Sequence, residues 1–69
     1  MDKIDLAIEE YKKALESNRD YANAYYNLGM AYLKKNESRA AMSAFQEVLR
    51  IAPDSEIGQL SKEYLDTLK

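Results

Sequence analysis

The sequence predicts an all-α fold built from about four helices. Apolar residues recur every three or four positions along most of the 69 residues, which is the spacing of one face of an α-helix. The chain contains a single proline, Pro53, and only two glycines, Gly29 and Gly58. No stretch shows the strict alternation of apolar and polar residues that indicates a β-strand. These observations predict helices joined by short turns within one small domain.

The first predicted helix runs from Lys3 to Ser17, and Asp2 is expected to cap its N-terminus. Its apolar stripe, at helical spacing, consists of Ile4, Ala7, Ile8, Tyr11, Ala14 and Leu15. The segment SNRDY then interrupts the pattern. Asp20 in this segment is expected to cap the second helix.

The second predicted helix runs from Tyr21 to Lys35 and is apolar on nearly all sides, which predicts burial against several neighbours. Its apolar residues are Ala22, Ala24, Tyr25, Tyr26, Leu28, Met30, Ala31, Tyr32 and Leu33. Gly29 lies in its middle, where a glycine costs roughly 1 kcal/mol of stability relative to alanine. A close contact at Gly29 is expected to offset that cost.

The third predicted helix runs from Glu37 to Ile51. Before it, Asn36 is suited to a left-handed backbone conformation, and Ser38 is expected to support the helix start. Pro53 and Asp54 are expected to end this helix and to cap a fourth one, which reaches Leu68. The apolar side of the fourth helix consists of Ile57, Leu60, Tyr64, Leu65 and Leu68.

The first and third predicted helices are versions of one element. Ala7, Tyr11 and Ala14 are followed 34 residues later by Ala41, Phe45 and Val48. Between them, Tyr25-x2-Leu28-Gly29-x2-Tyr32 precedes Ala41-x3-Phe45 and then Pro53. This arrangement resembles the tetratricopeptide repeat (TPR) family, whose repeat is 34 residues long, with Tyr25 in place of the family's tryptophan.

The resemblance implies a fragment of a TPR-type solenoid, made of antiparallel helix–turn–helix units. Residues 1–21 would be the second helix of a partial repeat, residues 22–55 a complete repeat and residues 56–69 a capping helix. The capping helix carries Lys62 and Glu63 where the family has its Leu-Gly pair. In the family, small residues sit where the two helices of a repeat come closest, and Gly29 and Ala41 occupy those positions here.

Several function classes receive no support from the sequence. The chain has no cysteine and no histidine, so no disulfide is possible and a zinc site is not expected. The net charge is −2 without a basic block, which argues against nucleic-acid binding. No apolar run is long enough to cross a membrane. We therefore expect no enzyme activity, no cofactor, no membrane insertion and, by default, a cytoplasmic location.

The resemblance implies a protein-interaction module that binds a peptide or a partner helix on the concave face of the solenoid. In the second helix, the stripe expected to line that face consists of Asn23, Tyr26, Asn27, Met30, Leu33 and Lys34. Two interpretations stay open at this point. The apolar part of the stripe is either free to bind a partner or covered by the first and fourth helices.

A second hypothesis assigns the chain a structural role as a self-assembling module. Ala7, Tyr11 and Ala14 correspond to residues that pack on the second helix in the complete repeat. The helix expected to cover them is absent from this sequence. Two copies of the chain are therefore expected to meet through the first helix and to form a homodimer around a two-fold axis.

Overall fold

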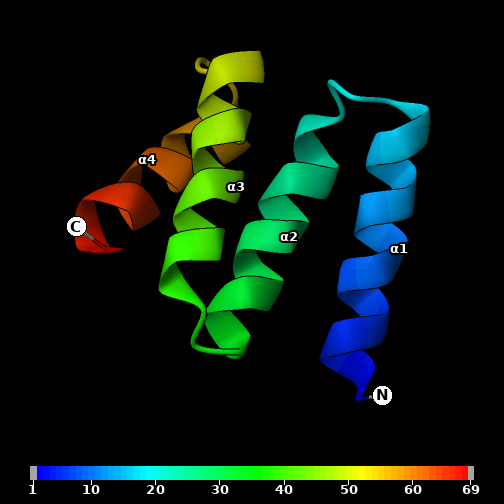
Figure 1. The fold of residues 1–69 in the computed structure, drawn as a ribbon. Helices are drawn as coiled ribbons and strands as arrows, with labels where there is room; N and C mark the ends of the chain where they lie inside the picture. The colour runs from blue at the N-terminus through cyan, green and yellow to red at the C-terminus, as the bar shows by residue number, and fades with distance from the viewer. Residues whose placement is uncertain (1, 69) are drawn as a thin grey trace.

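The computed structural model describes residues 2–68 and contains four α-helices within that range. They are α1 (Lys3–Ser17), α2 (Ala22–Lys34), α3 (Ser38–Ile51) and α4 (Glu56–Leu68). Figure 1 shows α1, α2 and α3 lying side by side with short turns between them, and α4 packing on the far side of α3. The predicted all-α fold is confirmed, and the predicted helix limits agree to about one residue at each end.

The helix α2 is the centre of the fold, because it contacts each of the other three helices. One core cluster joins α1 to α2 and α3 and consists of Ile8, Leu28, Ala31 and Ala44. A second cluster joins α3 to α4 and consists of Ala41, Phe45 and Leu65, with side chains from α2 packed against it. The expectation that α2 is buried on several sides is thus confirmed.

The second cluster is organised around an aromatic row that crosses three helices. The wholly buried ring of Phe45 stacks on Tyr64 of α4, with ring centroids 5.0 Å apart and an interplanar angle of 8°. The ring of Tyr26 from α2 also packs near Phe45, tilted by 59° at a centroid distance of 5.9 Å. Aromatic pairs of this kind contribute about 0.5–1.5 kcal/mol each beyond the burial of their area.

Gly29 provides the space that Phe45 fills. A Cβ atom built on Gly29 would lie 2.6 Å from Cε1 of Phe45, and the three nearest atoms all belong to this ring. The close contact predicted at Gly29 is confirmed. The structure adds a partner that the sequence did not indicate, since the Phe45 ring fills the space next to Gly29.

Asp2 caps α1 as predicted, whereas Asp20 does not cap α2. The backbone N–H of Asp5 donates to Oδ1 of Asp2 at 2.8 Å. At α2 the N-cap residue is Tyr21, whose side chain makes no capping hydrogen bond. Asp20 therefore lies one position too early for its side chain to reach the first turn.

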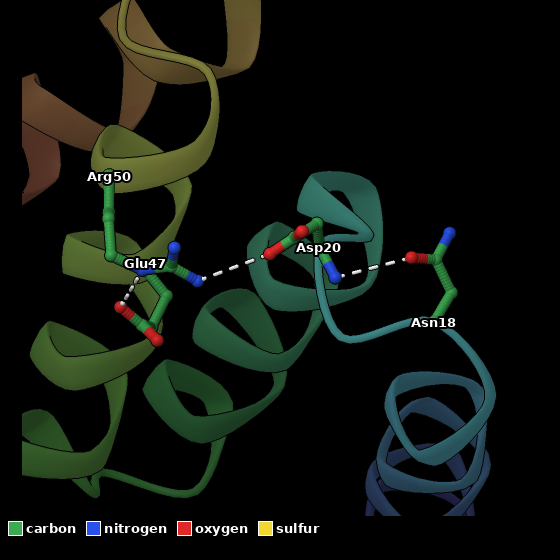
Figure 2. A network of polar contacts seen from close by, with 4 residues as sticks. All are labelled: Asn18, Asp20, Glu47 and Arg50. Atoms are coloured by element: carbon green, nitrogen blue, oxygen red, sulfur yellow. Dashed lines mark hydrogen bonds and ion pairs between the residues drawn. The ribbon is translucent and has the colours of Figure 1, made fainter.

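Asp20 takes part instead in the polar network of Figure 2. Its Oδ1 lies 3.5 Å from Nη2 of Arg50, and its backbone N–H donates to Oδ1 of Asn18 at 3.2 Å. The same guanidinium donates from Nε to Glu47 at 3.0 Å. The carboxylate of Asp20 thus links the α1–α2 turn to the end of α3.

The start of α3 is set by the backbone. Asn36 has a φ of 60°, which confirms its predicted left-handed conformation. The N-cap residue is Glu37, and no side chain makes a capping hydrogen bond there, so the role expected of Ser38 is not found. Ser38 is already the first residue of the helix.

Ser55 rather than Asp54 caps α4. The backbone N–H of Gly58 donates to Oγ of Ser55 at 3.0 Å, which is the spacing of an N-cap side chain and the third helical residue. The same hydroxyl donates to the carbonyl oxygen of Ala52 at 2.8 Å. One side chain therefore joins the first turn of α4 to the end of α3.

Gly58 has a structural role that the sequence analysis did not identify. A Cβ atom at this position would lie 2.2 Å from the carbonyl oxygen of Ala52 and 2.9 Å from that of Pro53. Only a glycine allows α4 to begin this close to the turn that precedes it.

Candidate functional site

The polar half of the predicted binding stripe is open to solvent. Asn23, Asn27 and Lys34 are all exposed. They lie four and seven positions apart in α2, so their side chains share one face of the helix. The structure thus presents two amide groups and one ammonium group in a row along α2.

The apolar half of the stripe is partly used to hold the fold together. Tyr26, Met30 and Leu33 are half-buried and pack against the second core cluster, which consists of Ala41, Phe45 and Leu65. Part of their surface therefore faces α3 and α4, whereas the interpretation from the sequence named the first and fourth helices as the cover.

The pKa of Tyr26 reflects the partial burial of its side chain. Burial raises the pKa of its hydroxyl above the ordinary value, and the neighbouring Tyr64 and Glu56 raise it further. The hydroxyl therefore lies beside residues of α4.

A groove of about 340 Å³ lies between α1 and α2. Its α1 wall consists of Lys3, Ile4, Ala7 and Tyr11, and its α2 wall consists of Asn27, Met30, Ala31 and Lys34. The groove thus brings together three residues of the predicted binding stripe and two of the residues predicted for self-association. From the sequence these two sets were expected to form separate surfaces, because residue spacing does not show how α1 lies on α2.

The α1 residues predicted for self-association are less buried than their counterparts in α3. Ala7, Tyr11 and Ala14 are half-buried. The residues 34 positions later, Ala41, Phe45 and Val48, are all 0% exposed. Tyr11 also packs against the core cluster around Ile8, so the expectation that this face is uncovered holds only for part of it.

Two further hollows flank the central helix. Asn23 lies away from the α1–α2 groove, in a hollow of about 390 Å³ lined by Tyr21, Ala22, Ala52, Ser55, Glu56 and Ile57. Another hollow, of about 410 Å³, is lined by Tyr25, Leu28, Tyr32, Ala40, Ser43, Ala44 and Glu47. Sequence reasoning missed this last hollow, because helical spacing gives the face of each residue but not the gap between two helices.

Charge is distributed unevenly around the α1–α2 groove. Nζ of Lys35 donates to Oδ1 of Asp5, which ties the end of α2 to the start of α1 and raises the pKa of Lys35. Lys3 and Lys34 lie on the two walls of the groove, and within residues 2–68 neither forms an ion pair. The groove therefore carries one lysine on each wall, and neither has an ion-pair partner among the described residues.

The described residues contain neither a candidate metal-binding cluster nor a candidate membrane span. Within residues 2–68, no three acidic side chains come together in a way that could hold a metal ion. None of the four helices has the length and apolar character needed to span a bilayer. The arrangement is suited to contact with another polypeptide through apolar area and hydrogen bonds.

Comparison with known proteins gives consistent results. The family described as TPR repeat matches residues 2–36, and the one described as tetratricopeptide repeat matches residues 22–55. A curated relative, the tetratricopeptide repeat domain-containing protein PYG7, chloroplastic, of Arabidopsis thaliana, is 36% identical over 64 residues. The match covers 93% of this chain and only 21% of that relative's length. No solved structure gives a significant match. With these matches and the four-helix fold, the chain belongs to the tetratricopeptide repeat family.

Proposed function

We propose that this chain is a protein-interaction module whose α2 face binds a peptide or a helix of another protein. TPR repeats generally mediate protein–protein interaction, and the stacked helices offer an elongated surface for it. The contact surface in this proposal consists of Asn23, Tyr26, Asn27, Met30, Leu33 and Lys34. The chain has no expected catalytic residue, and binding is its whole proposed activity.

The observation that carries the proposal is the mixed character of the α2 stripe. Exposed Asn23 and Asn27 supply amide groups that both donate and accept hydrogen bonds, as a peptide backbone requires. Half-buried Met30 lies in the groove between α1 and α2 and supplies apolar area beside them. A polar rim around a partly buried apolar strip is the usual composition of a peptide-binding surface.

A selection experiment tests the proposal. A library of random 16-residue peptides would be panned against the full chain, and the recovered peptides would be measured by fluorescence anisotropy. Loss of about 1 kcal/mol for each amide hydrogen bond predicts that Asn27→Ala and Asn23→Ala each weaken binding about fivefold.

Gln46→Ala is the matched control, because Gln46 is an exposed amide on α3 outside the stripe. It should leave binding unchanged. If every recovered peptide binds the two asparagine variants as tightly as the original chain, the α2 stripe is not the contact surface.

The self-assembling alternative is supported by a different observation. Ala7, Tyr11 and Ala14 are half-buried, although the equivalent residues of α3 are wholly buried. Burial of this remaining apolar area by a second copy would contribute about 25 cal/mol per Å². Light scattering across a range of protein concentrations would detect a dimer, and Ala7→Glu should convert it to a monomer.

The cellular location stays a prediction. The relative from Arabidopsis thaliana is named as a chloroplast protein, and that name describes the relative alone. Expression of the fluorescently tagged chain in its own cells would test the cytoplasmic location that we propose.

A further inference from the structure

We propose that the groove between α1 and α2 receives an amphipathic α-helix of a partner protein, with a small residue opposite Tyr11 and an acidic residue beside Lys3. This inference rests on the proposed interaction function and names the kind of partner. It follows from comparing the groove with the equivalent surface of the same chain.

The two surfaces correspond residue by residue at the repeat spacing of 34. The groove residues Ala7 and Tyr11 of α1 correspond to Ala41 and Phe45 of α3. The groove residue Ala31 of α2 corresponds to Leu65 of α4. Ala41, Phe45 and Leu65 form the second core cluster, so the groove is the counterpart of a surface that is covered elsewhere in this chain.

The helix that covers this counterpart surface is α2. Its side chains Tyr26, Met30 and Leu33 pack against the cluster formed by Ala41, Phe45 and Leu65. The groove between α1 and α2 is therefore a surface on which one further helix could pack. None of the four described helices occupies it.

The requirement for a small residue comes from Gly29. Even a methyl group at this position would lie 2.6 Å from the ring of Phe45, so a helix that packs over this ring needs a glycine there. Tyr11 occupies the equivalent position on α1 and is longer than phenylalanine by a hydroxyl group. A helix seated in the groove consequently needs a glycine opposite Tyr11.

The requirement for an acidic residue comes from a reversal of charge between the two surfaces. At the covered surface, Glu37 is the N-cap residue of α3 and lies at the C-terminal end of α2, where its backbone N–H donates to the carbonyl oxygen of Tyr32 at 2.9 Å. The residue of α1 equivalent to Glu37 is Lys3. A helix in the groove with the same orientation as α2 would thus have its C-terminal end near Lys3. There, both an acidic side chain and the partial negative charge of the helix C-terminus would attract the lysine.

The probe is a 17-residue peptide with the sequence of residues 20–36 of this chain, because α2 is the helix already seen on the equivalent surface. It would be made unchanged, with Lys35→Glu, and with both Lys35→Glu and Gly29→Leu. Fluorescence anisotropy against the full 69-residue chain would measure each affinity. We expect the Lys35→Glu peptide to bind about fivefold more tightly than the unchanged one, and Gly29→Leu to abolish its binding.

Variants of the chain locate the bound peptide. Lys3→Glu should reverse the preference, so that the unchanged peptide binds more tightly than the Lys35→Glu peptide. Lys13→Glu is the matched control, because Lys13 is an exposed lysine of α1 outside the groove, and it should leave the preference as it was. This reversal also distinguishes the groove from the seat of α2 itself, which lies beside Glu37 rather than Lys3.

Filling the groove provides the second test. Ala7→Trp should abolish binding of the Lys35→Glu peptide. Ala40→Trp changes another half-buried alanine, in the hollow between α2 and α3, and should have no effect. Circular dichroism would verify that both variants are folded, and Lys3→Glu remains informative if Ala7→Trp is not.

Three results would overturn the inference. The first is an absence of saturable binding up to millimolar peptide. The second is binding that is insensitive to Lys3→Glu and to Ala7→Trp; if library peptides still respond to Asn23→Ala, the proposed function stands without the groove. The third is a dimer in light scattering that Ala7→Trp converts to a monomer, which would assign the groove to a second copy of the chain.

Discussion

Gly29 of α2 and Phe45 of α3 share one volume that can hold only one side chain. A Cβ atom on Gly29 would lie 2.6 Å from Cε1 and 2.7 Å from Cζ of the ring. The ring has no room to move away, because it is wholly buried and stacks on Tyr64. This pair fixes how closely the two helices of the repeat approach each other.

Gly29→Ala should therefore destabilise the chain, although alanine favours a helix by about 1 kcal/mol over glycine. Gly29→Leu should lower the free energy of unfolding further. Overpacked cores typically lose about 1–3 kcal/mol, and this variant should lose at least that much. Urea unfolding followed by circular dichroism would measure both variants. In a Phe45→Leu background the cost of Gly29→Ala should shrink, since the ring is then gone. An alanine variant at least as stable as the original chain would contradict this account.

Gly58→Ala should be more damaging than Gly29→Ala. The added methyl group would lie 2.2 Å from the carbonyl oxygen of Ala52, and a backbone atom yields less readily than a side chain. Gln59→Ala is the neighbouring control, because Gln59 is exposed and its replacement removes no packing. Thermal unfolding should show a large loss for Gly58→Ala and almost none for Gln59→Ala. Equal melting temperatures would exclude a close contact at Gly58.

Ser55→Ala and Asp54→Ala distinguish the observed cap of α4 from the predicted one. Loss of the Ser55 hydroxyl removes its hydrogen bonds to Gly58 and Ala52 and should cost about 1 kcal/mol. Asp54 is exposed and its replacement should change the unfolding free energy little. Asp20→Ala should likewise have little effect, because its contact with Arg50 joins two well-exposed side chains. The opposite order of costs would restore the prediction that Asp54 is the cap.

Ser61→Ala should leave stability unchanged or raise it. Ser61 is 0% exposed, and within the described residues its hydroxyl oxygen has no hydrogen-bond partner. A buried hydroxyl without a partner costs about 1–3 kcal/mol, and alanine removes that cost while leaving only a small void. Ser43→Ala, at an exposed position of α3, serves as the control. A marked loss of stability in Ser61→Ala alone would indicate that the hydroxyl is hydrogen-bonded in solution.

Alkaline pH should destabilise the fold through Tyr26. Burial and the neighbouring Tyr64 raise its pKa above the ordinary 10.0. Because the pKa of Tyr26 is higher in the folded chain than in the unfolded chain, the protonated hydroxyl favours folding. This contribution to stability is complete below about pH 10 and is lost as the pH rises through the pKa of the folded state. Melting temperatures between pH 8 and pH 11 should fall less steeply for Tyr26→Phe than for the original chain. Tyr21→Phe controls for loss of a tyrosine hydroxyl at an exposed position. An identical alkaline decline in Tyr26→Phe would show that Tyr26 does not contribute.

Much of the fold follows from local sequence. The helical spacing of apolar residues predicted α1 to α4 within about a residue, because such spacing depends only on the 3.6-residue turn of the helix. The left-handed conformation of Asn36 follows from its residue type and its position between two helices. The spacing from Tyr25 to Pro53 indicated the repeat family without any knowledge of contacts.

The caps were harder to predict, because capping depends on the single residue at which a helix begins. Asp20 and Asp54 are both favourable cap residues by type. Each lies one position before the observed N-cap residue, so its side chain does not reach the first turn. Residue preference alone does not resolve a difference of one position.

The candidate site was predicted in composition but not in arrangement. The sequence by itself determined which side chains share the α2 stripe, because residues three and four apart lie on one face of a helix. Only the tertiary structure decided that Tyr26 packs on Phe45, that Met30 lines a groove with Ala7, and that Gly58 lies against Ala52. These relationships depend on how far apart the helices lie and how they are turned. The distances and angles between the helices are set by the packing of side chains from several helices at once. The spacing of residues within one helix therefore does not predict them.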